Sequence, residues 1–142
     1  MPSVKDLMTK DVVTISSSKT VYDAAVLMTE KKIGSLIVID GTTPVGIVTE
    51  RDLVRKVVYQ RLLPQEIKIS EIMSKPLVTI DPDSSIREAA RLMLKNTIRR
   101  LPVVKDNKLA GILTTTDFAK HLSKKTITEE VLDVMARHPP IH

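Results

Sequence analysis

The sequence of 142 residues contains no cysteine, and aromatic residues make up only 2% of it. Without cysteine the chain cannot have a disulfide framework, a thiol nucleophile or a zinc–thiolate site. The two tyrosines and one phenylalanine are too few for the stacking platforms that bind single-stranded nucleic acid. These absences exclude several common ways for a small protein to act.

Long apolar segments are absent as well. No apolar run approaches the roughly 20 residues that a membrane-spanning helix needs. Residues 1–6 also lack the basic and then apolar layout of a signal peptide. We therefore expect a cytoplasmic protein that does not bind a membrane.

The balance of charge leaves two interpretations open. Lys and Arg number 22 and Asp and Glu 17, so the net charge is +5. A basic protein can bind nucleic acid or a phosphorylated small molecule. A net charge of this size is also common in proteins where it only confers solubility. Nucleic-acid binding predicts a steep salt dependence. It remains the alternative function, although the basic residues are scattered along the chain.

The chain repeats itself at an interval of 65 residues. The equivalent pairs include Met8 and Met73, Thr14 and Thr79, Met28 and Met93, Gly46 and Gly111, Thr49 and Thr114, and Asp52 and Asp117. Two units of about 60 residues are each at the edge of what buries a useful core. We expect them to fold against each other with pseudo-twofold symmetry, so that any ligand site occurs in two related copies.

Each repeat predicts the same order of elements. The expected elements are a helical lead-in (4–8; 69–73), an extended piece (12–15; 77–80), an amphipathic helix from residue 21 or 86, two strands (36–39 and 45–48; 101–104 and 109–113), and a helix near Asp52 or Asp117. The helix that opens near Asp52 is expected to run toward Leu63, because Pro64 stops it. This β-α-β-β-α order predicts a mixed α/β (α+β) fold. The predicted domains are a first repeat over 4–63, a linker over 64–68, a second repeat over 69–124, and a C-terminal segment over 125–142 that contains a helix at 128–137.

The motif Thr-x-x-Asp follows a strand and opens a helix in both repeats, at Thr49 and Asp52 and again at Thr114 and Asp117. A carboxylate there can accept hydrogen bonds from two adjacent hydroxyls such as those of a ribose, each worth roughly 1.5–3 kcal/mol. The same motif also resembles a capping box, which needs no ligand. Both interpretations stay open from the spacing, and one residue can do both.

Catalytic and metal-binding groups are not predicted. We find no nucleophile paired with a base, no Walker-type loop and no metal-ligand set, so we expect no enzyme. His138 and His142 have a metal-like spacing, but Pro139 and Pro140 between them prevent a common helix face. No cofactor is expected beyond a regulatory ligand.

Taken together, the repeated motifs resemble the CBS domain, which is named for cystathionine β-synthase and occurs in tandem pairs called Bateman modules. The motifs that carry the resemblance are residues 6–8, 13–15 and 46–52 in the first repeat, and 71–73, 78–80, 100–104 and 111–117 in the second. The resemblance covers residues 4–122. It implies a stand-alone regulatory pair that binds an adenine nucleotide such as AMP, ADP or ATP in the cleft between the repeats. S-adenosylmethionine is the other adenosyl ligand that it allows.

The resemblance also implies site residues, with the base-lining residues of one repeat facing the Thr-x-x-Asp of the other. One expected site combines Thr14, Gly34, Ser35 and Leu36 with Thr114, Thr116 and Asp117. The other combines Thr79, Arg100, Leu101 and Pro102 with Thr49, Arg51 and Asp52. For Thr14 and Thr79 a simple preference for strand is the alternative.

A basic pair in the second repeat distinguishes it from the first. Arg99 and Arg100 stand where the family often places side chains that reach phosphate, and the guanidinium fork suits phosphate. The first repeat has Gly34 and Ser35 there, so we expect phosphate-bearing ligands to prefer the arginine-lined site. The family further implies a homodimer formed through helices and a downstream protein target, which the sequence does not identify.

Overall fold

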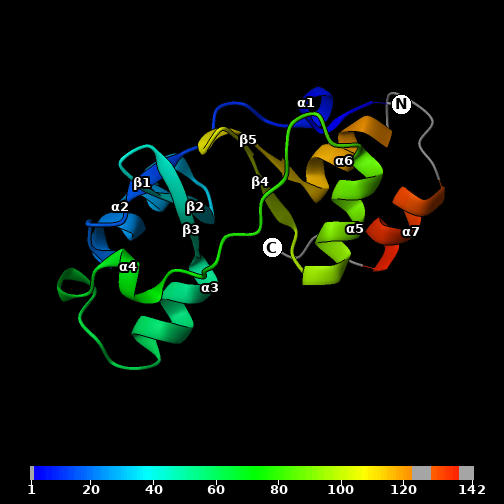
Figure 1. Ribbon diagram of the computed structural model, residues 1–142. Helices are drawn as coiled ribbons and strands as arrows, with labels where there is room; N and C mark the ends of the chain where they lie inside the picture. Colours follow the sequence, from blue (N-terminus) through cyan, green and yellow to red (C-terminus); the bar gives the residue numbers. More distant parts are fainter. Residues whose placement is uncertain (1, 123–128, 138–142) are drawn as a thin grey trace. The chain divides into compact units, whose positions relative to one another are not determined.

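A computed structural model describes residues 2–122 and 129–137 of the chain. Its elements, shown in Figure 1, are α1 (Val4–Leu7), β1 (Thr14–Ser16), α2 (Val21–Lys31), β2 (Ser35–Asp40), β3 (Thr43–Thr49), α3 (Glu50–Leu53), the π-helix η1 (Val54–Val58), the 3-10 helix η2 (Pro64–Glu66), α4 (Ile69–Ile72), α5 (Ile86–Asn96), β4 (Arg100–Lys105), β5 (Lys108–Thr114), α6 (Thr115–Leu122) and α7 (Glu129–Arg137). They group into two compact units. The first-repeat unit is Val12–Leu77, and the second-repeat unit comprises residues 2–11, 78–122 and 129–137. The predicted mixed α+β class is confirmed.

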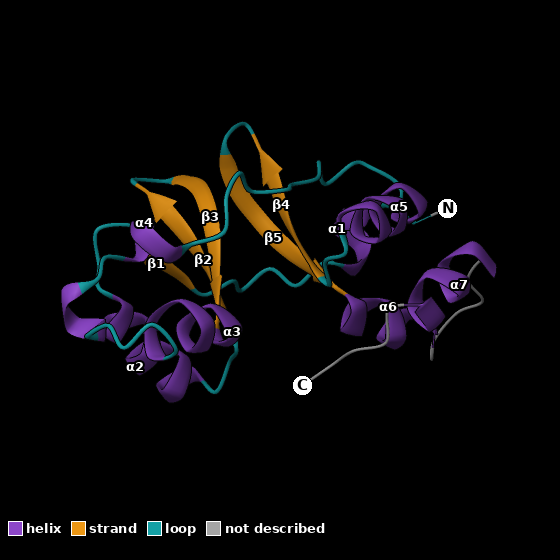
Figure 2. Cartoon of the chain, turned by 90° about the horizontal axis from the view of Figure 1, so that it is seen from below, coloured by secondary structure: helices purple, strands orange, loops and turns teal. Residues whose placement is uncertain are grey.

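The first-repeat unit contains a three-stranded sheet in the order β1-β2-β3 (Figure 2). Strand β1 pairs in parallel with β2 because α2 carries the chain back between them. Strands β2 and β3 form a hairpin in which Asp40 pairs with Thr43, so the loop has two residues. Gly41 in that loop has a φ of 65°, a left-handed conformation that glycine adopts without strain.

The second-repeat unit has the matching hairpin of β4 and β5. Its two loop residues, Asp106 and Asn107, have φ values of 51° and 63°, as a type I′ turn requires. Both hairpins also shift register at equivalent places, between Val38 and Ile39 and between Val103 and Val104. The two repeats therefore share local irregularities as well as elements.

The extended piece predicted at 77–80 is a strand in only its last residue. Ile80 makes an isolated parallel bridge to Val103, whereas the first repeat has the full strand β1. In the first repeat the amide of Ile37 donates to the carbonyl of Val13 at 3.4 Å. In the second repeat the counterpart of Ile37 is Pro102. Because proline has no N–H to donate, the equivalent hydrogen bond between the strands cannot form.

Each core lies between a sheet and the amphipathic helix packed on it. Helix α2 buries Val21, Ala24 and Met28 in the first-repeat unit. Helix α5 buries its stripe in the second-repeat unit in the same way, through Ile86, Ala89, Ala90 and Met93. The predicted apolar stripes thus face the cores.

The lead-in helices are exchanged between the repeats. Val4 of α1 is fully buried in the core of the second-repeat unit, and its amide donates to the carbonyl of Ser84 at 2.8 Å. Ile69 of α4 is fully buried in the first-repeat unit, and its amide donates to the carbonyl of Lys19 at 2.9 Å. The compact units therefore differ from the predicted ranges 4–63 and 69–124 at their lead-in segments.

Helix α3 ends earlier than the sequence predicts. It continues as the π-helix η1 only to Val58, where the amide of Tyr59 donates back to the carbonyl of Val54 at 2.8 Å. Arg61 then takes a positive φ of 60°, which breaks the helix before Leu63 and Pro64 are reached.

The predicted C-terminal helix is confirmed as α7, which packs on α5 and α6 within the second-repeat unit. Thr128, Pro139, Pro140, His138 and His142 lie outside the described residues. Among the described residues, no helix is long and apolar enough to cross a membrane.

Candidate ligand-binding site

Both Thr-x-x-Asp motifs form capping boxes. Thr49 accepts a hydrogen bond on Oγ1 from the amide of Asp52 at 3.3 Å, and its own amide donates to Asp52 Oδ2 at 2.9 Å. In the second repeat the equivalent bonds of Thr114 and Asp117 measure 3.3 and 2.8 Å. The capping interpretation is thus confirmed for both repeats, and each aspartate is held in one orientation.

The two aspartates are buried and strongly hydrogen-bonded. Asp52 is 8% exposed and Asp117 is 7% exposed. In each, Oδ2 also accepts a bond from the threonine hydroxyl, at 3.1 Å in the first repeat and 3.2 Å in the second. A carboxylate offers about four acceptor positions, so these bonds leave capacity on Oδ1.

The Oδ1 atoms of the two aspartates have different partners. Asp52 Oδ1 lies 3.2 Å from Lys56 Nζ, which also donates to the carbonyl of Ile72 at 2.8 Å. Asp117 Oδ1 accepts a hydrogen bond from Thr9 Oγ1 at 3.1 Å. A cation therefore neutralises the first carboxylate, and a neutral hydroxyl from the lead-in segment holds the second.

Sequence reasoning missed both of these partners. Lys56 follows Asp52 by four residues, a spacing that favours an ion pair on a helix and could have revealed it. Its counterpart in the second repeat is His121, so the repeat comparison also singles it out. Thr9 had no local signal, because it reaches Asp117 only through the exchange of the lead-in segments.

The predicted base-lining residues lie beside the Thr-x-x-Asp of their own repeat. Ser35 pairs with Thr49 across the β2–β3 hairpin, and the amide of Glu50 donates to the carbonyl of Gly34 at 3.0 Å. Thr14 begins β1 and pairs with Ile37, two residues beyond Ser35. These residues of the first repeat therefore gather at one end of one sheet.

The second repeat gathers its residues in the same way. Arg100 pairs with Thr114, and the amide of Thr115 donates to the carbonyl of Arg99 at 3.2 Å. The expected grouping of residues from one repeat with the Thr-x-x-Asp of the other stays a prediction.

The predicted residues differ in how much they offer to a ligand. Leu36 and Leu101 are buried in the cores, with 1% and 0% of their surface exposed. Those that are partly or fully exposed are Thr14, Gly34, Ser35, Thr49, Arg51, Thr79, Arg99, Arg100, Thr114 and Thr116. Pro102 is buried as well. The leucines and the proline are thus buried residues of the strands, and the exposed residues are the ones that can make polar contacts with a ligand.

The glycine upstream of each motif has a packing role. A Cβ on Gly111 would lie 2.7 Å from the carbonyl oxygen of Thr9, and one on Gly46 would lie 3.0 Å from that of Ser74. These oxygens accept backbone hydrogen bonds from the strands at Ile112 and Ile47. The glycines therefore let the lead-in segments lie directly against β5 and β3.

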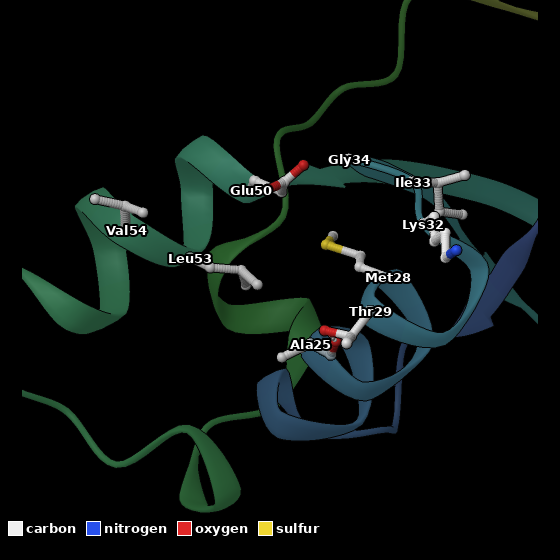
Figure 3. A pocket seen from close by; sticks show the side chains of 9 residues that line it. All are labelled: Ala25, Met28, Thr29, Lys32, Ile33, Gly34, Glu50, Leu53 and Val54. Atoms are coloured by element: carbon white, nitrogen blue, oxygen red, sulfur yellow. Dashed lines mark hydrogen bonds between the residues drawn. The ribbon is translucent and has the colours of Figure 1, made fainter. Parts of the chain in front are cut away.

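A hollow of about 380 Å³ lies on the helical side of the first-repeat unit (Figure 3). Its lining residues are Ala25, Met28, Thr29, Lys32, Ile33, Gly34, Glu50, Leu53 and Val54. Of the predicted site residues it includes only Gly34. Among the residues that the structure describes, no three His, Cys, Asp or Glu side chains are grouped as a metal ion would need.

Comparison with known proteins finds the same two repeats. The chain matches the CBS domain over residues 4–59 and again over 69–124. It is 44% identical over 117 residues to an uncharacterized protein of Methanopyrus kandleri, a match that covers 81% of this chain and 60% of that protein. The chain therefore spans less than two thirds of that relative.

Two solved structures extend the comparison. A CBS-domain protein from Burkholderia ambifaria has a TM-score of 0.79 at 34% identity, and the match covers 89% of this chain and 98% of that one. The hexameric CBS-CP12 protein of bloom-forming cyanobacteria has a TM-score of 0.76 at 36% identity, covering 96% of this chain and 79% of that one.

Proposed function

This chain belongs to the CBS-domain family as a tandem pair, and from that premise we propose that it binds an adenine nucleotide, AMP, ADP or ATP, and signals its presence. CBS pairs are generally regulatory, ligand-sensing modules. The nucleotide would report through a change in the arrangement of the repeats, which requires that it bind one arrangement more tightly than another.

The observation that carries the proposal is the oriented carboxylate of each Thr-x-x-Asp. Asp52 and Asp117 are fixed by their capping boxes, yet their Oδ1 atoms keep acceptor capacity. The adjacent hydroxyls of a ribose are donors that suit this acceptor. The capping box thus supports ligand binding by setting the direction of the carboxylate.

The basic pair supports a phosphate-bearing ligand. Arg100 begins β4 opposite Thr114 and Arg99 directly precedes the strand, whereas the first repeat has Gly34 and Ser35 in the equivalent positions. We propose that the phosphate of the nucleotide is bound on the arginine-bearing side, so that the two sites differ in affinity.

Thermal unfolding with AMP, ADP, ATP, S-adenosylmethionine and inorganic phosphate tests the proposal. A ligand at 100 times its dissociation constant should stabilise the folded state by about 2.7 kcal/mol. Asp52→Asn and Asp117→Asn keep the shape of the capping residue while removing its charge. Loss of the shift in one of them identifies the aspartate in use.

Each outcome has a distinct meaning. A shift with adenine nucleotides but not with phosphate supports the proposal, and a shift with S-adenosylmethionine alone replaces the nucleotide with that ligand. If no adenosyl compound shifts the transition, the motif is only a cap. Salt-sensitive binding to DNA would then favour the nucleic-acid alternative.

We also propose that the chain forms a homodimer that acts on a separate target protein in the cytoplasm. The CBS-CP12 relative is hexameric, so self-association occurs among proteins 36% identical to this one.

A further inference from the structure

The hydrogen bonds that Asp117 makes with described residues leave little of its carboxylate for a ligand. A carboxylate offers about four acceptor positions, two on each oxygen. The amide and the hydroxyl of Thr114 donate to Oδ2 at 2.8 and 3.2 Å, and the hydroxyl of Thr9 donates to Oδ1 at 3.1 Å. About one position, on Oδ1, therefore remains. It suffices for a ligand that donates one hydroxyl, whereas two adjacent hydroxyls need a second position on the same carboxylate.

The bond from Thr9 is the one that can give way. Thr9 is exposed, so its hydroxyl can donate to water when it leaves Asp117. The amide of Thr114 donates in a partly buried place, and a buried amide that loses its acceptor is costly. The bonds of Thr114 also form the capping box at the start of α6. A ligand with two adjacent hydroxyls can thus replace Thr9 on Oδ1 and leave Oδ2 unchanged.

Thr9 is the last residue whose backbone fastens the lead-in segment to the second-repeat unit. Its amide donates to the carbonyl of Ile112 at 2.9 Å, and its carbonyl accepts from the amide of Ile112 at 2.9 Å. Lys10 and Asp11 make no backbone hydrogen bond to any residue that the structure describes. Val12 then begins the first-repeat unit. The hydroxyl that holds the motif carboxylate is therefore placed where the chain passes from one repeat to the other.

The first repeat makes a connection of the same kind with a different side chain. Ser74, the counterpart of Thr9, has the equivalent pair of backbone bonds to β3, at 2.9 and 3.2 Å. The Oδ1 atom of Asp52 pairs with Lys56 instead, at 3.2 Å, and Lys56 Nζ donates to the carbonyl of Ile72 at the end of α4 at 2.8 Å. In both repeats the partner of Oδ1 thus ties the carboxylate to the lead-in segment, directly in one and through a lysine in the other.

We infer that a nucleotide held at Asp117 by two ribose hydroxyls takes the place of Thr9, so that Thr9 reports whether this site is occupied. The inference rests on the proposed nucleotide binding and adds the contact through which occupancy reaches the lead-in segment. The exchange breaks the bond between Thr9 Oγ1 and Asp117 Oδ1 and makes one from a ribose hydroxyl to the same oxygen. Coupling of this kind is reciprocal: the Thr9 hydroxyl weakens nucleotide binding by as much as the nucleotide weakens the Thr9 bond.

Isothermal titration calorimetry of the full chain with AMP and with 2′-deoxy-AMP tests this exchange. The deoxy compound has a single ribose hydroxyl and can bind without displacing Thr9. We expect Thr9→Val to bind AMP about 10-fold more tightly than wild type, because a competing bond to a charged acceptor is gone, and to bind 2′-deoxy-AMP with unchanged affinity. Thr9→Ser, which retains the hydroxyl, should resemble wild type. The matched control is Ser74→Ala at the equivalent position of the first repeat, which should change neither affinity.

The outcomes separate the exchange from nucleotide binding itself. A wild-type chain that binds no adenine nucleotide overturns the proposed function and this inference together. If Thr9→Val leaves AMP affinity unchanged or lowers it, or gains equally for AMP and 2′-deoxy-AMP, the exchange is overturned while nucleotide binding stands. Thermal unfolding gives a second reading. The stability gap between wild type and Thr9→Val should narrow at saturating AMP, because the bound nucleotide has already replaced the Thr9 bond, and a gap that stays constant contradicts the exchange.

Discussion

The first-repeat and second-repeat units have equivalent elements but differ in what covers their helices. In the second-repeat unit, α7 packs on α5 and α6, and its Val131 is completely buried. In the first-repeat unit, α2 and α3 have no such helix among the described residues, and Val58 is 68% exposed. The two repeats thus share their elements, but a further helix covers the helix pair of only one of them among the described residues.

Disrupting the packing of α7 on α5 and α6 should produce the largest loss of stability. Val131→Asp puts a charge into the core that α7 closes, and we expect it to lower the free energy of unfolding by about 3–4 kcal/mol. Urea denaturation measures this loss. The control Val26→Asp, at an exposed position of α2 in the other unit, should change the free energy of unfolding by no more than about 0.5 kcal/mol. Equal losses in the two variants would contradict the difference between the covered helix pair α5–α6 and the uncovered pair α2–α3.

The next largest effect concerns the lead-in segments. Gly111→Ala forces a Cβ to within 2.7 Å of the carbonyl oxygen of Thr9, and we expect a loss of about 2 kcal/mol. Gly46→Ala should cost less, because its nearest neighbour is the flexible side chain of Met73 and the carbonyl of Ser74 is at 3.0 Å. Thermal unfolding of both variants gives the order. The reverse order would show that the first-repeat lead-in is held more rigidly.

The partners of the two aspartates should differ in their response to salt. Thr9→Val removes the hydrogen bond from an uncharged hydroxyl to the carboxylate of Asp117 and should cost about 1.5 kcal/mol, with little dependence on ionic strength. Lys56→Met removes the ion pair to Asp52. Because the lysine side chain is 43% exposed, the loss should be about 0.5–1 kcal/mol. Urea titrations in low and high salt separate them, because only the Lys56 effect should shrink as salt rises. A salt-independent Lys56 effect would mean that its bond to the Ile72 carbonyl dominates.

The smallest effect comes from the ion pair that ties α1 to its unit. Lys5 donates to Asp83 at 2.8 Å, which raises the pKa of Lys5 and lowers the pKa of Asp83 below its ordinary value of 3.8. A lowered carboxyl pKa stabilises the fold above pH 3.8, and this contribution disappears as the pH falls through the pKa of the folded state. The raised pKa of Lys5 contributes below pH 10.5 and is lost above it.

Asp83→Asn should therefore be slightly less stable than wild type at neutral pH. The difference should close as the pH drops below 3.8, and salt should weaken it because both groups are exposed. Thermal midpoints across acid and neutral pH provide the measurement. The matched control is Ser18→Ala, at the position equivalent to Asp83, which should show no closing of the gap in acid. A gap that persists at low pH would assign the effect to the turn itself.

Local pattern accounts for most of the agreement between sequence and structure. The stripe of Ile86, Ala89 and Met93 predicts a buried helix face, and Asp106 with Asn107 predicts a tight hairpin turn. The capping boxes were equally visible, since three-residue spacing defines them. Two predictions did not hold. The strand at 77–80 is shortened because Pro102 on the neighbouring strand has no amide N–H, and the helix toward Leu63 ends early because Arg61 takes an uncommon left-handed conformation.

Residue order alone determines the duplication, the elements and the position of each Thr-x-x-Asp, because periodicity, turn residues and caps act over a few neighbouring residues. Three-dimensional packing determines the rest. It brings Thr9 to Asp117, places Val4 and Ile69 in the opposite repeat, and lays α7 over one helix pair only. These contacts join residues far apart in the chain. Their free energy depends on complementary shape and burial, which no short stretch of sequence specifies.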